Sequence, residues 1–200
     1  MKSDTPFRQD RLHFYSIRFN TGSPSFFSKL RLCISDFGLH SVAVYRFGRA
    51  AHSIYTRSKL IGFIPVLIYK IMNLFVKTIH HVDISSRAEI GPGFFIMHYY
   101  TILIGSVKAG RNLTVHHNLT IGQRVAGLDR SIPEIGDDVW IGPNCVITGD
   151  IKIGQGATIS AGTVLTRSVR DYSLVGGNPG RVIIHDYDNK TMSVKKSKKP

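Results

Sequence analysis

The hydrophobic pattern of the chain changes its period near residue 80. Residues 25–60 place apolar side chains three to four positions apart, which is the spacing of helices packed on one side. Gly38 and Gly48 are weak points at which this helical pattern is expected to divide. The first 24 residues predict no clear element.

Residues 60–77, LIGFIPVLIYKIMNLFVK, form the most apolar run of the chain. Lys70 interrupts the run and Pro65 is expected to kink it, so it is a poor membrane span. We expect a core or interface helix here. The alternative is a helix that lies on a membrane surface, because such helices combine an apolar face with basic residues.

From residue 84 onward, aliphatic residues recur every six positions. This period suits neither a helix nor an alternating strand and is typical of a parallel β-helix, in which each unit forms one short rung. The fourth residue after each repeat position is apolar or small, Cys145 included, so it is expected to fill the interior of the coil. The repeat positions are Ile84, Ile90, Ile96, Ile102, Ala109, Val115 and Ile121, with one extra residue after Ile102, and then Ile135, Ile141, Ile147, Ile153, Ile159 and Leu165.

The sequence therefore predicts a mainly β fold with three parts. Residues 1–80 are a helical N-terminal segment, residues 81–185 a parallel β-helix, and residues 186–200 a basic tail without structure.

The composition adds a strong positive charge, with 26 Lys and Arg against 13 Asp and Glu, a net +13. This excess favours an anionic partner such as nucleic acid, membrane headgroups or a phosphate-bearing co-substrate. The chain shows no nucleic-acid-binding motif, so we expect no nucleic acid. Two distant cysteines and an N-terminus without a signal peptide predict a cytoplasmic protein, with a possible contact at the inner face of the membrane.

Two histidines occupy equivalent places in the repeat. His98 stands two residues after Ile96, and His117 two residues after Val115. If these rungs lie on the same face of successive coils, the two side chains are neighbours at about 4.8 Å, the spacing of adjacent strands. Such a pair suits a functional site. The plain alternative is that both lie on the outer face of the coil without a role.

The repeat and the terminal VGGNPGRVI (175–183) resemble the hexapeptide-repeat acyltransferases, whose fold is a left-handed parallel β-helix and whose chains form homotrimers. Residues 80–185 also resemble the serine acetyltransferases and their polysaccharide-modifying relatives, in which an aspartate stands fifteen residues ahead of the catalytic histidine. Asp83 and His98 have this spacing. The resemblance implies a general base at His98 and a carboxylate at Asp83 that orients it. A neutral imidazole suits removal of a hydroxyl proton, since its pKa lies near working pH, and a carboxylate fixes its tautomer.

The same resemblance implies acetyl-CoA as the donor, bound along an edge of the coil. Small residues let a ligand approach the backbone, and Arg suits phosphate. The alternative is that small residues serve tight turns and that the arginines are merely solvated. The positions that match are Gly122, Gly142, Ser160, Ala161 and Gly162 for the pantetheine arm, and Arg167 and Arg181 for the phosphates.

The acceptor is predicted from departures from the serine acetyltransferase pattern. Met97 replaces an aspartate before the base, and Ile132 replaces a histidine before a proline in the inserted loop 123–134. Loss of these polar groups weakens the case for serine. We expect a hydroxyl of a sugar or polysaccharide precursor, with serine as the alternative. The expected acceptor residues are Met97, Tyr99, His117 and Arg130.

A metal enzyme is the competing hypothesis. Carbonic anhydrases built on the same β-helix bind zinc through three histidines, for which His98, His116 and His117 are candidates. The fifteen-residue link between Asp83 and His98 is explained only by the acyltransferase hypothesis, so we expect no metal.

Overall fold

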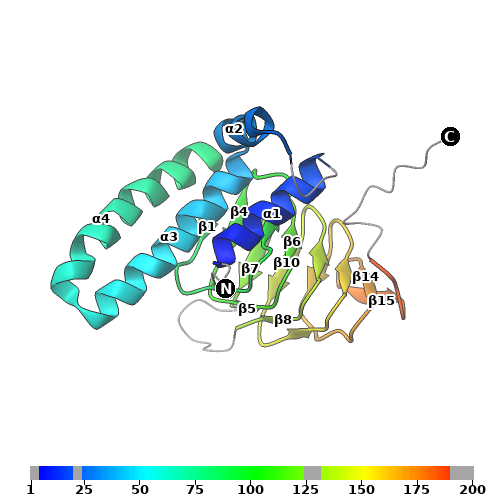
Figure 1. Ribbon diagram of the computed structural model, residues 1–200. Helices are drawn as coiled ribbons and strands as arrows, with labels where there is room; N and C mark the ends of the chain where they lie inside the picture. The colour runs from blue at the N-terminus through cyan, green and yellow to red at the C-terminus, as the bar shows by residue number, and fades with distance from the viewer. Residues whose placement is uncertain (1–4, 20–23, 124–131, 190–200) are drawn as a thin grey trace.

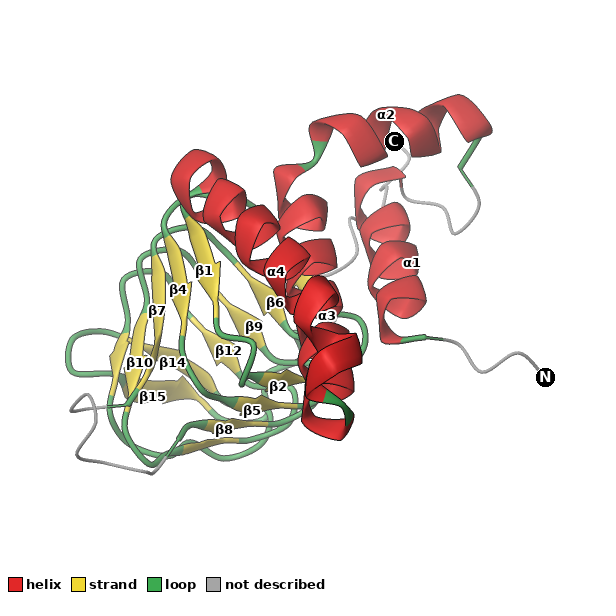
Figure 2. Ribbon diagram, turned by 90° about the vertical axis from the view of Figure 1, so that its left-hand side faces the viewer, coloured by secondary structure: helices red, strands yellow, loops and turns green. Residues whose placement is uncertain are grey.

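The computed structural model describes residues 5–19, 24–123 and 132–189. Helices at the N-terminal end lie against one end of a triangular coil of short strands (Figure 1, Figure 2). The helices are α1 (Pro6–Phe19), α2 (Phe26–Ser35), α3 (Phe37–Arg57) and α4 (Lys59–Phe75), followed by a π-helical turn at Val76–His80.

The coil has three faces, each a sheet of stacked strands. The first sheet contains β1 (Val82–Ile84), β4 (Ile102–Ile104), β7 (Leu119–Gly122), β10 (Val146–Thr148) and β13 (Val164–Leu165). The second contains β2 (Glu89–Ile90), β5 (Lys108–Ala109), β8 (Glu134–Ile135) and β11 (Lys152–Ile153). The third contains β3 (Phe95–Ile96), β6 (Thr114–Val115), β9 (Trp140–Ile141), β12 (Thr158–Ile159), β14 (Leu174–Gly176) and β15 (Arg181–Ile184).

All strand pairs are parallel except the last, β14 with β15. The predicted β-solenoid and its preceding helices are thus confirmed. The interior is filled by the repeat positions and by the fourth residues that follow them, as predicted. Fully buried examples are Phe94, Cys145, Ala157 and Thr163.

One detail of the predicted register is wrong. Ile84 aligns with Ile104 and then with Ile121, so Ile104 rather than Ile102 occupies the repeat position. The step from the repeat position Ile96 to the repeat position Ile104 is eight residues, where a regular step is six. The extra length therefore lies in the corner between these two strands. This corner, residues 97–101, contains His98.

Two expectations for the helical segment are also corrected. Residues 6–19 form α1, and α3 continues through Gly48, while the division expected near Gly38 falls at Asp36, between α2 and α3. Gly48 is required for close packing, since a Cβ there would lie 2.3 Å from the Tyr69 ring of α4. Gly48 is thus a position where two helices approach closely, and α4 likewise continues through Pro65.

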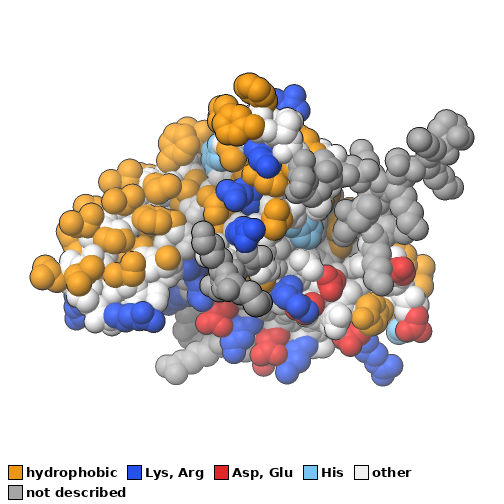
Figure 3. Space-filling model, viewed as in Figure 1, with side chains coloured by type: hydrophobic (Ala, Val, Ile, Leu, Met, Phe, Trp, Pro, Cys, Tyr) orange, Lys and Arg blue, Asp and Glu red, His pale blue; other side chains and the backbone are white. Residues whose placement is uncertain are grey.

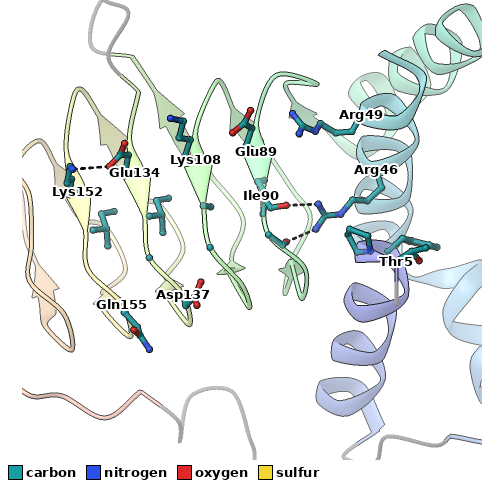
Figure 4. Close-up of a pocket in the computed structure, with 18 of the residues that line it drawn as sticks. Thr5, Arg46, Arg49, Glu89, Ile90, Lys108, Glu134, Asp137, Lys152 and Gln155 are labelled. Carbon is teal, nitrogen blue, oxygen red and sulfur yellow. Dashed lines mark hydrogen bonds and ion pairs between the residues drawn. The ribbon is translucent and has the colours of Figure 1, made fainter. Parts of the chain in front are cut away.

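A buried ion pair fastens the helices to the first coil, and Figure 4 shows one of its members, Arg46, hydrogen-bonded to Ile90. Asp10 of α1 is fully buried, and Arg46 of α3 donates to both of its carboxylate oxygens, at 2.7 and 3.0 Å. Arg46 also donates to the carbonyls of Ile90 and Gly91, both at 2.6 Å. Asp10 further accepts from the backbone N–H groups of residues 93 and 94, at 2.8 and 2.9 Å. Every charge in the cluster is therefore hydrogen-bonded.

We predict that Asp10→Ala lowers the free energy of unfolding by about 3–5 kcal/mol, because it leaves the Arg46 charge buried without its partner. Thermal unfolding followed by circular dichroism measures the change. The matched control is Glu134→Ala, which breaks the exposed pair with Lys152 (3.2 Å) and is expected to cost about 0–1 kcal/mol. Equal losses in both variants would contradict a structural role for the cluster.

Candidate active site

The corner that follows the third sheet collects the residues predicted for chemistry. Pairing of Ile96 with Val115 and of Val115 with Ile141 places equivalent residues of successive coils next to one another. His98 therefore lies beside His117, as predicted, with ring centroids 5.7 Å apart. His116 lies one position earlier, 6.0 Å from the His98 ring.

His98 is exposed at the surface, and its pKa lies below the ordinary value of 6.5. Partial burial is the main cause, and the nearby His117 and Arg18 add to it by disfavouring a further positive charge. The neutral ring, which is the form that can accept a proton, is therefore favoured at neutral pH.

The helices form the other wall of a cavity of about 320 Å³ at His98. Arg18 donates to the carbonyl of Met97 and to the carboxylate of Asp36, both at 2.9 Å. Asp36 also caps α3 through the N–H of Leu39 at 3.0 Å. The lining residues are Arg18, Phe19, Arg31, Leu32, Ser35, Asp36, Met97, His98 and Tyr99.

Arg18, Arg31 and Asp36 did not emerge from the sequence. They lie more than sixty residues from His98 along the chain and follow no repeat, so only the folded helices bring them to the cavity. Tyr99, which is expected to contact the acceptor, also lines this cavity. It also packs edge-on against Phe37, with ring centroids 5.0 Å apart.

The predicted contact between Asp83 and His98 is not found among the interactions of the described residues. Asp83 points outward from β1, where its neighbour in register is Leu103, and its carboxylate lies 2.8 Å from the ammonium of Lys77. Asp83 and Leu103 are the middle residues of β1 and β4, whereas His98 lies in the corner that precedes β4. The spacing of fifteen residues between Asp83 and His98 therefore did not predict the direction in which the Asp83 side chain points.

The residues predicted for acetyl-CoA fall into two groups. Gly142 and Ser160 directly follow the paired residues Ile141 and Ile159 and so lie at the His98 corner, where Ala161 and Gly162 follow. Arg181 is the first residue of β15 and pairs with Gly176. Gly176 follows Val175, the partner of Ile159, so Arg181 lies at the same corner as Ser160. Gly162 has a φ of +73° and open space where a Cβ would stand, so a ligand has room to approach its backbone.

Gly122 and Arg167 lie instead on the corner that follows the first sheet. Gly122 also has open space around it. The predicted acceptor residue Arg130 lies outside the described residues, as does most of the inserted loop, 124–131.

His116 belongs to the same corner but is not exposed. His116 is buried, its Nδ1 lies 2.9 Å from the carbonyl oxygen of Ile141, and its ring packs against Trp140. Among the described residues no group of three or more His, Cys, Asp or Glu side chains is placed to hold a metal ion.

A larger groove of about 1,890 Å³ runs between the helices and the second sheet (Figure 4). Its lining alternates in charge through Glu89, Lys108, Glu134 and Lys152, and contains no histidine or cysteine. The smaller cavity, by contrast, is lined by the imidazole of His98.

Comparisons with known proteins agree with this fold. The bacterial transferase hexapeptide (six repeats) family matches residues 133–167. The serine acetyltransferase of Bacillus pumilus (strain SAFR-032) is 32% identical over 164 residues, which cover 82% of this chain and 71% of that protein.

Two solved structures are also similar. The serine acetyltransferase of Brucella abortus strain S19 in complex with coenzyme A gives a TM-score of 0.72 at 24% identity, over 90% of this chain and 66% of that one. The Neisseria gonorrhoeae serine acetyltransferase in complex with serine gives a TM-score of 0.70 at 25% identity, over 90% of this chain and 68% of that one. The chain belongs to the hexapeptide-repeat acyltransferases, in the family that includes the serine acetyltransferases. It is an acetyltransferase.

We predict that kcat/KM falls in acid with an inflection below pH 6.5. The lowered pKa of His98 keeps the ring neutral until the pH drops through that pKa, below which the protonated ring can no longer accept a proton. His117→Gln removes a neighbouring charge and should move the inflection upward. His185→Gln, an exposed histidine after β15 at the other end of the coil, should leave it in place. A wild-type inflection above pH 6.5 would contradict the assignment.

Proposed function

We propose that the protein is an acetyl-CoA-dependent O-acetyltransferase in which His98 is the general base. The observation that carries the proposal is that His98, an exposed imidazole with a lowered pKa, lines a cavity of about 320 Å³. His98 lies where the column of small residues on the coil edge reaches the wall made by the helices.

The reaction needs one proton transfer and one bond exchange. His98 takes the hydroxyl proton as the acceptor oxygen attacks the thioester carbonyl. The carbon–sulfur bond then breaks, and the proton passes to the departing thiolate. Because the acceptor attacks directly, no protein nucleophile is needed. Asp83 would have to leave Lys77 to orient the imidazole, so this mechanism rests on His98.

Acetyl-CoA is the proposed donor because a similar protein, the Brucella abortus serine acetyltransferase, has been solved with coenzyme A. The small residues of the His98 corner, from Gly142 to Gly162, offer the backbone that a pantetheine arm would follow. Arg181 lies beside the same corner for the phosphates.

Serine is the first acceptor to consider, because the similar proteins named above are serine acetyltransferases and one was solved with serine. This support is stronger than that for the sugar acceptor expected from the sequence. Arg18 and Arg31 supply the cavity with positive charge, which suits the carboxylate of an amino acid.

A sugar hydroxyl is the second candidate, and the cavity itself favours it. The carboxylate of Asp36 already accepts from Arg18 and from the N–H of Leu39, and Met97 stands next to the base. Among the described residues that line the cavity, there is thus no uncommitted carboxylate for an ammonium group. A neutral or anionic polyol, such as a sugar, needs none.

We predict that His98→Asn lowers the rate of acetyl transfer by about 10²–10⁴-fold, the usual contribution of a positioned base. Release of free thiol from acetyl-CoA measures the rate, and unfolding temperature checks that the fold is kept. His185→Asn is the matched control and should retain full activity. Turnover of His98→Asn at the wild-type rate would remove the proposed mechanism.

The acceptor is tested with labelled acetyl-CoA, serine and a panel of sugars. We predict that the wild type acetylates serine and that Met97→Asp raises kcat/KM for serine by roughly tenfold, because a carboxylate beside the base would pair with the ammonium group. Met97→Asn, without the charge, is the control. Acetylation of a sugar but not of serine, by wild type and Met97→Asp alike, would reject the first candidate in favour of the second.

A further inference from the structure

Helix α4 exposes an apolar surface much larger than its packing requires. Its buried and half-buried positions include a seam against the rest of the protein with steps of three or four residues, Gly62, Val66, Tyr69, Asn73, Val76 and His80. Outside this seam a water-exposed helix normally carries polar residues. Here six large apolar side chains are between 60 and 87% exposed: Leu60, Ile61, Phe63, Ile64, Ile71 and Leu74.

A second apolar surface lies on α2. Phe26, Phe27, Leu30 and Ile34 are each between 47 and 80% exposed. Figure 3 shows hydrophobic side chains over the outward side of α4 and again on α2, with Lys and Arg side chains at the edges. Contiguous exposed apolar surface of this kind marks an interaction site.

The positive charge of the chain is concentrated in the same segment. Residues 1–80 carry 12 Lys and Arg against 3 Asp and Glu, whereas residues 81–185 carry 9 against 8. The helical segment therefore holds +9 of the total +13, and the coil only +1. Asp10 and Asp36, the acidic side chains of the segment that the structure describes, are both buried in ion pairs. The helices thus present positive charge beside their apolar surface.

We propose that α4 and α2 dock this segment on the surface of an anionic lipid bilayer. Apolar side chains would enter the boundary of headgroups and acyl chains, while Lys59, Lys70 and their basic neighbours would meet lipid phosphates. A second copy of the chain is the less suitable occupant, because it would bring two segments of +9 together.

The helix lies on the membrane surface. Lys59–His80 is long and apolar enough to span a bilayer by composition. Its seam, however, packs on α3 within one antiparallel pair, and α3 carries Arg46, Arg49 and His40. A spanning α4 would have to leave this partner or take those polar groups into hydrocarbon, which is costly.

Co-sedimentation of the full chain with vesicles tests the proposal. We expect binding to vesicles that contain phosphatidylglycerol, much weaker binding to pure phosphatidylcholine, and loss of binding as salt rises from about 0.1 M to about 0.5 M. Phe63→Ser with Ile71→Ser should weaken binding by roughly tenfold per side chain removed. Ile183→Ser on β15, whose side chain is 61% exposed, is the matched control and should bind normally.

Acetyl transfer to a soluble acceptor, measured on the same variants, separates this proposal from the proposed function. The double variant should keep wild-type turnover while its binding to anionic vesicles is lost. Absence of wild-type binding to anionic vesicles would overturn the proposal. So would a double variant that still binds them, or an oligomer that dissociates on the double substitution without any binding of lipid, which would assign the surface to a second copy.

Discussion

The buried ion pair between Asp10 and Arg46 is the constraint on which the arrangement of the site depends. It binds α1 and α3 to the first coil at the carbonyls of Ile90 and Gly91 and at the N–H groups that open the β3 rung. Residues 95 and 96 of that rung lead directly into the corner of His98. With the helices fixed there, Arg18 reaches the carbonyl of Met97, and the cavity acquires its second wall. A coil alone would present His98 to open solvent.

The two parts of the chain therefore contribute different properties to one site. The repeat supplies a rigid edge on which equivalent residues of successive coils line up, and it places His98 and His117 together without any special sequence. The helices supply charge and enclosure, which favour the neutral imidazole. The same helices carry most of the positive charge of the protein and large exposed apolar side chains.

The sequence predicted the coil well because burial of two residues in every six leaves a regular pattern. It predicted the neighbourhood of His98 and His117 for the same reason. It missed α1, because the buried Asp10 interrupts the apolar face of that helix between Phe7 and Phe14. It misplaced the lengthened corner because both Ile102 and Ile104 point inward. The direction of Asp83 and the approach of Arg18 depend on packing between distant segments, which leaves no local pattern in the sequence.

A crystal structure with coenzyme A bound tests the central claim most directly, because the protein offers two cavities. The account predicts the thiol within hydrogen-bonding reach of the His98 ring, with the pantetheine arm along the corner of Gly142 and Ser160. Coenzyme A bound instead in the groove over β2, β5, β8 and β11, with its sulfur far from His98, would contradict it.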